Sequence, residues 1–311
     1  MKKFEVNPLI LTGITLCAFA ANSFLGRAAL GSAQIDPLTY TLVRLLSGAV
    51  ALVVLLRMQG LGRISGSWAG ALALLAYAVF FSLAYVHLAT GTGALVLFGL
   101  VQLTMMGYAA MKGDVLKGLR LLGALLAVVG LLVLLWPKLQ TPDSLLAALS
   151  MALSGAAWGA YSLLGRGSKS PLADTAGNFC RAGVLMLLVW AVMYFLAGRG
   201  VHIPGVTALQ GNVFQKVVWP MPTWGGLLLA VASGALASGM GYALWYRVLP
   251  ALPATSAATV QLAVPVLATL AGTLMLGEAL GVRLIVSMVL TLGGIYWVLN
   301  PQKKPASQSV D

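Results

Sequence analysis

The sequence predicts an all-α integral membrane protein with ten transmembrane helices, arranged as two inverted five-helix repeats. Three observations lead to this fold class. Hydrophobic residues make up 60% of the 311 residues and charged residues only 8%, whereas a soluble domain carries about 25% charged residues. Apolar runs of roughly 20 residues, each long enough to cross a bilayer core as a helix, recur from end to end. Short motifs of the first half return in the second half.

The repeated motifs indicate which parts of the two halves correspond. They pair Gly113-Asp114 with Gly277-Glu278, Gly130 with Gly294, Pro137 with Pro301, Leu25-Gly26-Arg27 with Leu164-Gly165-Arg166, and Pro37-Leu38-x-x-Thr41 … Arg44 with Pro171-Leu172-x-x-Thr175 … Arg181. We therefore predict a first repeat at residues 1–139 and a second at residues 140–311. Because each repeat has an odd number of spans, the second must sit upside down in the bilayer. Inverted repeats are typical of carriers that alternate access around a central site.

The ten spans follow from apolar runs that are punctuated by turn-forming residues. We expect them at residues 8–30, 38–56, 68–88, 93–111, 117–136, 144–165, 174–197, 223–249, 254–276 and 279–299. The breaks fall at Asp36-Pro37, Trp136-Pro137, Thr141-Pro142-Asp143, Ser170-Pro171, Pro220-Met221-Pro222 and Pro250 … Pro253. Residues 198–222 are predicted to form a long outer loop. The first span is too long for a signal peptide and more spans follow it, so we expect it to remain uncleaved.

Lysine and arginine in the connections predict the orientation of the chain, because cytoplasmic loops are enriched in both. With a cytoplasmic N-terminus, the inner side holds Lys2, Lys3, Arg57, Arg63, Lys112, Lys117, Arg120, Arg166, Lys169, Arg247, Lys303 and Lys304. The outer side holds the smaller set of Arg27, Lys138, Arg199, Lys216 and Arg283. Both termini, including a short C-terminal tail, are therefore predicted to be cytoplasmic. The net charge of +12 reflects this topology, so no nucleic-acid partner is expected.

Charged residues inside the predicted spans are few. None of the seven carboxylates falls near the middle of a span, although a proton-coupled carrier often needs one there. This absence favours a carrier that is not coupled to protons. Arg44 and Arg181 lie about two turns into the second and seventh spans, and two interpretations remain open. In the first, each arginine snorkels or binds carbonyl groups at a helix end. In the second, each forms a gate or a carboxylate contact, Arg44 toward the outer side of the membrane and Arg181 toward the inner side.

Polar and aromatic side chains at mid-span depth are the candidates for a binding site. They are Asn22, Ser23, Tyr77, Gln102, Thr104, Trp158, Tyr161, Tyr242, Trp245, Tyr246, Thr259 and Gln261. Aromatic rings and amides without fixed charge suit a zwitterionic or neutral substrate with an apolar or aromatic body. Pro265 lacks an N–H group and leaves the carbonyl of Gln261 without its helical donor. That carbonyl and the Gln261 side chain either line a polar cavity or belong to an ordinary helix kink.

The motifs at the helix boundaries also resemble a known family. The Pro…Arg pattern of the second and seventh spans and the Gly-Asp/Glu…Gly pattern of the fifth and tenth spans resemble the drug/metabolite transporter superfamily, over nearly the whole chain. Within it the chain is most similar to EamA-type exporters of bacterial inner membranes, and among these to the aromatic amino acid exporter group. Two positions depart from the pattern: Asp114 replaces the commoner glutamate, and the fourth span lacks the proline that the ninth keeps as Pro265.

The resemblance implies a multi-pass inner-membrane carrier with a central cavity and no cofactor. It places Asn22, Tyr77, Gln102, Trp158, Tyr242 and Gln261 around the substrate path. From their own positions in the spans, Pro265, Arg44 and Arg181 are our candidates for hinges or gates. We therefore predict export of aromatic or apolar amino acids by alternating access, by a monomer or weak homodimer in the bilayer. Export of other metabolites or drugs and lipid flipping remain alternatives. An intramembrane enzyme is not expected, because the sequence has neither His-Glu-x-x-His nor paired mid-span aspartates.

Overall fold

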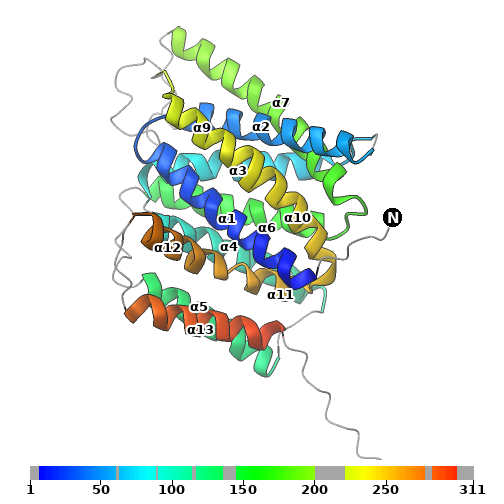
Figure 1. Cartoon of the computed structure of the whole chain (residues 1–311), viewed down its shortest axis with the longest axis vertical. Helices are drawn as coiled ribbons and strands as arrows, with labels where there is room; N and C mark the ends of the chain where they lie inside the picture. Colours follow the sequence, from blue (N-terminus) through cyan, green and yellow to red (C-terminus); the bar gives the residue numbers. More distant parts are fainter. Residues whose placement is uncertain are drawn as a thin grey trace, which may run out of the picture.

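The computed structural model describes residues 7–60, 63–88, 90–113, 117–135, 145–199, 221–276 and 282–299, which form helices and short connections. The helices are α1 (Pro8–Leu30), α2 (Pro37–Met58), α3 (Trp68–His87), α4 (Thr90–Met111), α5 (Leu119–Leu135), α6 (Leu145–Gly165), α7 (Pro171–Gly198), α9 (Trp224–Ala232), the π-helix η2 (Ser233–Met240), α10 (Gly241–Val248), the short 3₁₀ helix η3 (Leu249–Ala251), α11 (Ala254–Val260), α12 (Ala263–Leu276) and α13 (Val282–Leu299). Figure 1 shows their arrangement.

Each predicted span coincides with helix in the described residues, which confirms the all-α membrane fold. The eighth span is the unbroken run of α9, η2 and α10, whereas the ninth is divided into α11 and α12 at residues 261–262. Six helical segments are long and apolar enough to cross a membrane, namely α1, α2, α3, α6, most of α7 and the α9–η3 run; the other four spans contain shorter apolar helices. Many exposed side chains are large and apolar, including Val50, Leu103 and Leu188, as a lipid-facing surface requires.

Some sequence predictions concern residues outside the described ranges. They include residues 200–220 of the predicted outer loop, the C-terminal tail, Asp114, Gly277-Glu278 and the prolines Pro137 and Pro301. The orientation of the termini and the division into two repeats stay predictions.

The helices begin where short polar side chains satisfy their free N–H groups. The Asp36 carboxylate accepts from the backbone N–H groups of Leu38 and Thr39 at 3.0 and 2.9 Å, and Pro37 occupies the first turn. Ser67 and Thr223 cap α3 and α9 in the same way, accepting from N–H groups three residues on. The last two caps share the pattern Ser/Thr-Trp-x-Gly, which agrees with the correspondence predicted between the third and eighth spans.

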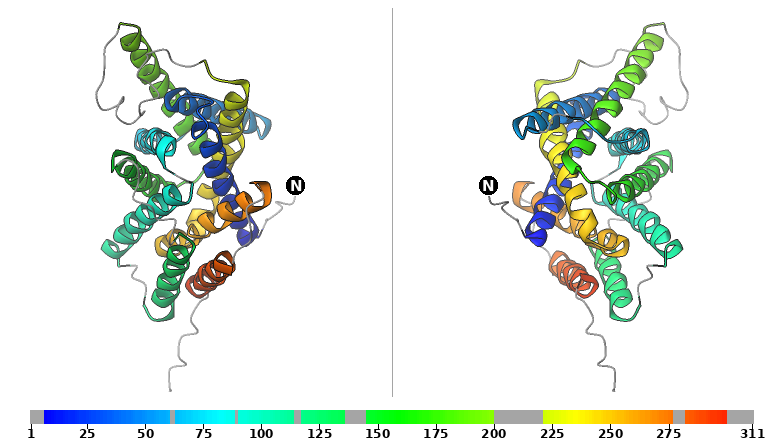
Figure 2. Two further views of the ribbon diagram at one scale, coloured as in Figure 1. Left: turned by 90° about the vertical axis from the view of Figure 1, so that its left-hand side faces the viewer. Right: turned by 90° about the vertical axis from the view of Figure 1, so that its right-hand side faces the viewer.

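The helices form an elongated body with α7 and α2 toward one end and the α5–α13 pair at the other (Figures 1 and 2). The middle contains α1, α3, α4, α6, the α9–α10 run and the α11–α12 pair. Extensive contacts join α5 to α13, α2 to α7, α3 to α6 and α4 to α6, and α1 lies against α10 and α12. The buried aromatic residues of this middle part belong to the larger of the two hydrophobic clusters of the described residues.

Close glycine contacts hold α5 against α13. A methyl group added to Gly294 would overlap the backbone of Gly123 and Ala127, and the Ser287 hydroxyl donates to the Gly130 carbonyl at 2.7 Å. Small residues of this kind let two helix backbones approach closely within lipid, where packing and interhelical hydrogen bonds drive association. The repeated glycines Gly130 and Gly294 therefore lie on one seam.

Gly294→Val is expected to destabilise the protein, because its side chain would meet backbone atoms that cannot move aside. Overpacking of this kind typically costs about 1–3 kcal/mol. Gly293→Val is the matched control, since a methyl group there meets no atom within 4 Å and the change in helix propensity is the same. Thermal unfolding in detergent measures the difference, and equal midpoints for the two variants would contradict this account of the seam.

Candidate functional site

Arg44 of α2 is buried in the middle of the molecule and bonded to hydroxyl groups from other helices. Its side chain is 1% exposed. Nη2 donates to the hydroxyls of Tyr77 and Tyr242 at 3.1 and 2.6 Å, and Nε donates to the Ser238 hydroxyl at 2.9 Å. The guanidinium carbon also lies 4.9 Å from the ring centre of Phe81, within the range of a cation–π contact. Arg44 thus joins α2, α3, η2 and α10.

No carboxylate of the described ranges balances the charge of Arg44. Those ranges contain two carboxylates, Asp36 and Asp174. Asp36 caps α2, and Asp174 accepts from the Gly66 backbone and from the hydroxyls of Ser65 and Ser168. Hydroxyls and ring faces are therefore the partners of Arg44, and its Nη1 has no hydrogen-bond partner in the same ranges. Its full burial excludes the snorkelling interpretation for this arginine.

Asn22 of α1 connects the same hydroxyls to the π-helix. Its Nδ2 donates to the Tyr77 hydroxyl at 3.1 Å. Its Oδ1 accepts from Ser233 at 2.6 Å and from Ser238 at 3.1 Å. The Tyr40 hydroxyl of α2 donates to Ser233 at 2.8 Å and completes the network. Arg44 and Asn22 are therefore two centres of one buried polar network.

The π-helix explains how Ser233 and Ser238 reach one amide oxygen. Residues five apart in an α-helix point about 140° apart, whereas the i→i+5 spacing of a π-helix brings them onto one side. The glycines of this segment also allow a close approach, because a methyl group at Gly234 would overlap the Arg44 carbonyl. No signal in the sequence marks this change of helix type.

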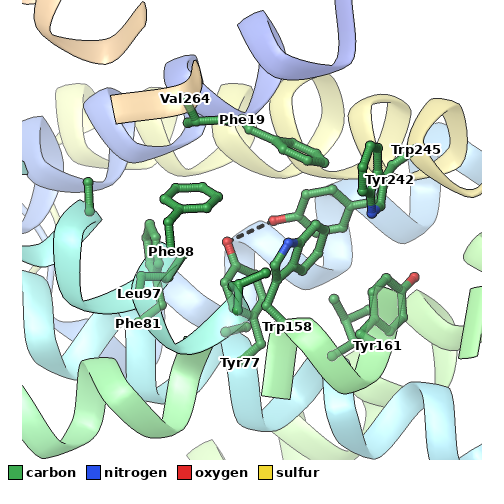
Figure 3. Packing of buried hydrophobic residues seen from close by; sticks show 14 of the residues in the cluster. Phe19, Tyr77, Phe81, Leu97, Phe98, Trp158, Tyr161, Tyr242, Trp245 and Val264 are labelled. Atoms are coloured by element: carbon green, nitrogen blue, oxygen red, sulfur yellow. Dashed lines mark hydrogen bonds between the residues drawn. The ribbon is translucent and has the colours of Figure 1, made fainter. Parts of the chain in front are cut away.

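Aromatic rings from four helices meet beside this polar network (Figure 3). The Trp158 ring centre lies 4.5 Å from that of Tyr242, 5.0 Å from that of Tyr77 and 5.2 Å from that of Phe19. The Tyr242 and Tyr77 hydroxyls are 3.0 Å apart, and the structure assigns the donor to Tyr242. Offset and edge-to-face contacts of this type stabilise aromatic clusters.

These side chains surround a small pocket. The lining residues are Phe19, Asn22, Ser23, Tyr77, Phe81, Leu97, Phe98, Trp158 and Tyr242. Its volume of ≈10 Å³ is about the room for one water molecule. The pocket brings together four of the six predicted substrate residues, Asn22, Tyr77, Trp158 and Tyr242. The described residues contain no group of His, Cys, Asp and Glu that could hold a metal ion.

Three of the lining residues that sequence reasoning missed lie one helical turn from candidates that it named. Phe19 is three residues before Asn22, and Phe81 is four residues after Tyr77. Spacings of three and four residues place side chains on one face of a helix. A search along the helix faces from Asn22 and Tyr77 therefore gives Phe19 and Phe81. Phe98 lies four residues before Gln102 and has the same kind of signal, whereas Leu97 has none.

Gln261 supports the pocket without lining it. Its Oε1 accepts from the indole N–H of Trp158 at 2.7 Å, and its Nε2 donates to the Ala257 carbonyl at 3.1 Å. The helix is interrupted at Gln261, four residues before Pro265, as the missing N–H group predicts. The expectation of a free carbonyl is wrong, however, because the Gln261 carbonyl accepts from the Val264 N–H at 3.0 Å in a tighter turn. Gln261 therefore positions the indole ring.

Gln102 and Arg181 lie outside the set of pocket-lining residues. The amide of Gln102 is buried in α4, and neither of its polar atoms has a partner in the described part of the chain. Arg181 donates to the Ser65 carbonyl at 2.7 Å and lies over the Trp68 ring, which matches the carbonyl-binding interpretation. Helices α2 and α7 run unbroken from Pro37 and Pro171. When these two prolines are aligned, Arg44 corresponds to Asn178 and not to Arg181, so the two arginines are not equivalent in position.

Gln261→Leu is expected to destabilise the protein by about 1–3 kcal/mol, because the buried indole N–H of Trp158 would lose its acceptor. Adding Trp158→Phe removes that donor as well, so the double variant should lose less than the sum of the two single variants. Thermal unfolding of the four proteins in detergent completes the cycle. Additive losses would show that the two side chains do not depend on each other.

Comparison with known proteins identifies the family. The model of the EamA-like transporter family matches residues 145–300. The chain is 48% identical over 296 residues to the uncharacterized protein PA1977 of Pseudomonas aeruginosa, covering 94% of this chain and 95% of that one. A crystal structure of a protein chain superposes with a TM-score of 0.71, 21% identity and coverage of 94% and 98%, which supports the fold alone. The predicted amino acid exporter group is not assigned by these matches, but the chain belongs to the EamA-like transporter family of membrane transporters, and so not to the enzymes.

Proposed function

We propose that this EamA-like transporter exports amino acids with apolar or aromatic side chains through the small pocket, by alternating access. The observation that carries the proposal is the composition of the pocket wall. Phe19, Trp158 and Tyr242 provide ring faces for an apolar body, and the hydroxyls bound to Arg44 provide one polar corner. A site that buries most of a ligand in apolar surface and orients it by a few polar groups is typical of small-molecule recognition.

The pocket must open for such a substrate to enter. A volume of ≈10 Å³ admits about one water molecule, so in this structure the pocket is too small for an amino acid. Two irregular segments adjoin the pocket, η2 and the interruption at residues 261–262. Interruptions of regular helical bonding are where helices bend, so we assign the opening motion to them.

The helix contacts support alternating access. In the predicted repeats, α1 corresponds to α6 and the eighth span corresponds to α3. The contact of α1 with α9, η2 and α10 is then the counterpart of the contact of α6 with α3. If one of these two interfaces loosened while the other tightened, the pocket would open on one side of the membrane and close on the other.

Purified protein in liposomes should release labelled phenylalanine, tyrosine or tryptophan down a concentration gradient. Trp158→Ala should reduce this flux at least tenfold, because it removes a central ring and its hydrogen bond to Gln261. Trp224→Ala is the matched control, since Trp224 is 83% exposed and lies away from the pocket lining. A substrate panel with other metabolites and fluorescent lipids tests the alternative cargoes, and no flux for any amino acid would reject the proposal.

The flux of zwitterionic amino acids should not respond to an imposed pH gradient. The two carboxylates in the described parts, Asp36 and Asp174, lie at helix ends rather than at the pocket, so neither is placed to carry a proton across with the substrate. Flux measured with equal and unequal pH on the two sides checks this expectation. Acceleration by an outside-acidic gradient during release would show proton coupling and contradict it.

A further inference from the structure

The polar corner of the pocket presents hydrogen-bond donors under a positive charge. Arg44 Nη2, Asn22 Nδ2 and the Tyr242 hydroxyl all converge on the Tyr77 hydroxyl oxygen. In a pair of neighbouring hydroxyls only one proton can lie between the oxygens. Only one of the two hydroxyl protons of Tyr77 and Tyr242 therefore lies between them, and both tyrosines line the pocket.

The oxygens at this corner are already occupied or carry no charge. Asn22 Oδ1 accepts from both Ser233 and Ser238. Ser23 adds a hydroxyl to the lining, and this group donates as readily as it accepts. No carboxylate is among the lining residues. The corner can therefore receive an anion, but it offers a cation no compensating charge.

Arg44 supplies the positive charge from directly behind the two tyrosines. Its guanidinium binds both hydroxyl oxygens, which strengthens their protons as donors through a charge-assisted chain. Its own Nη1 is buried without a partner in the described ranges. Guanidinium groups bind carboxylates well because their planar array of donors matches the two oxygens.

We infer that the pocket recognises its substrate through a carboxylate at the Arg44–Tyr77–Tyr242 corner and has no use for an ammonium group. The inference rests on the proposed function and extends its substrate class. Monocarboxylate anions with an aromatic or apolar body, and no amine, fit the site better than the zwitterionic amino acids of the same shape. In a zwitterion the ammonium group loses its hydration on burial and meets no negative partner.

Transport of such an anion moves one net negative charge across the membrane. A membrane that is negative inside then drives the anion outward, by about fifty-fold in equilibrium concentration ratio for each 100 mV. No carboxylate of the described residues lies at the pocket. This agrees with transport of an anion, because the electric field and not a proton gradient then supplies the driving force. A zwitterion carries no net charge and gains nothing from the field.

Three ligands that share one ring and differ in charge test the inference on purified protein in detergent. Phenyllactate has a hydroxyl in place of the ammonium group of phenylalanine, and 2-phenylethylamine lacks the carboxylate. Tryptophan fluorescence titration should show phenyllactate binding more tightly than phenylalanine, and no saturable binding of 2-phenylethylamine. Saturable binding of the amine, or of phenylalanine but not phenyllactate, would overturn the inference and leave the proposed function standing. No binding of either carboxylate would overturn both.

Variants separate recognition from folding. Tyr77→Phe keeps the ring and removes one hydroxyl, and Arg44→Gln removes the charge. Each variant should weaken phenyllactate binding by about ten- to hundredfold, because that is the effect of losing hydrogen bonds to a charged group. Arg57→Gln is the matched control, because Arg57 is exposed at the other end of the same helix. If Arg44→Gln fails to fold, Tyr77→Phe alone decides the result. Binding of phenyllactate by a folded Tyr77→Phe protein at the parental affinity would count against the assigned corner.

A voltage measurement tests the charge of the transported species. Liposomes loaded with phenyllactate, and clamped at an inside-negative potential by a potassium gradient with valinomycin, should release it faster than liposomes at zero potential. Empty vesicles correct for leakage, and phenylalanine release should be the same at both potentials. Phenyllactate release that ignores the potential would contradict the transport of a net anion.

Discussion

The contacts of Arg44 determine how the middle of this molecule is built. A charge in the interior of a membrane protein is kept only with partners, because burial without them costs several kcal/mol. Here the partners are the hydroxyls of Tyr77, Tyr242 and Ser238 together with the faces of aromatic rings. These groups belong to α3, α10 and η2, so helices distant in the sequence must meet around α2. Asn22 then brings α1 into the same network.

The aromatic wall depends on this arrangement in turn. Tyr77 and Tyr242 each have a hydroxyl in the polar network and a ring in the cluster around Trp158. Trp158 is held from its other side by Gln261, whose helix is interrupted at that residue. The polar and apolar halves of the pocket therefore share side chains, and a movement of either half changes the shape of the other. This coupling is what a transporter needs to link substrate binding to a change of packing.

The sequence was sufficient for the spans but not for the contacts inside them. Apolar length and proline positions located the helices to within a few residues, and mid-span depth selected Asn22, Tyr77, Trp158 and Tyr242, which all line the pocket. Depth alone does not distinguish a side chain that lines the pocket from one behind it, so Gln102 and Gln261 were grouped with the others. For Arg44 the sequence left two interpretations open, because hydropathy shows how deep a residue lies and not which tyrosines surround it. The π-helix of residues 233–240 follows from packing against α2, where the glycines admit a close approach.

The eight-residue π-helix has a geometric consequence for the run that contains it. A π-helix turns less per residue than an α-helix. With α-helical bonding in residues 233–240, α10 would therefore lie at a different rotation about the same axis. Conversion of η2 to α-helical bonding would rotate α10 relative to α9 by on the order of 100°. Tyr242 would then leave Tyr77 and Arg44, and Ser233 and Ser238 would no longer share Asn22. The contacts of Tyr242, Ser233 and Ser238 therefore depend on the π-helical form of this segment.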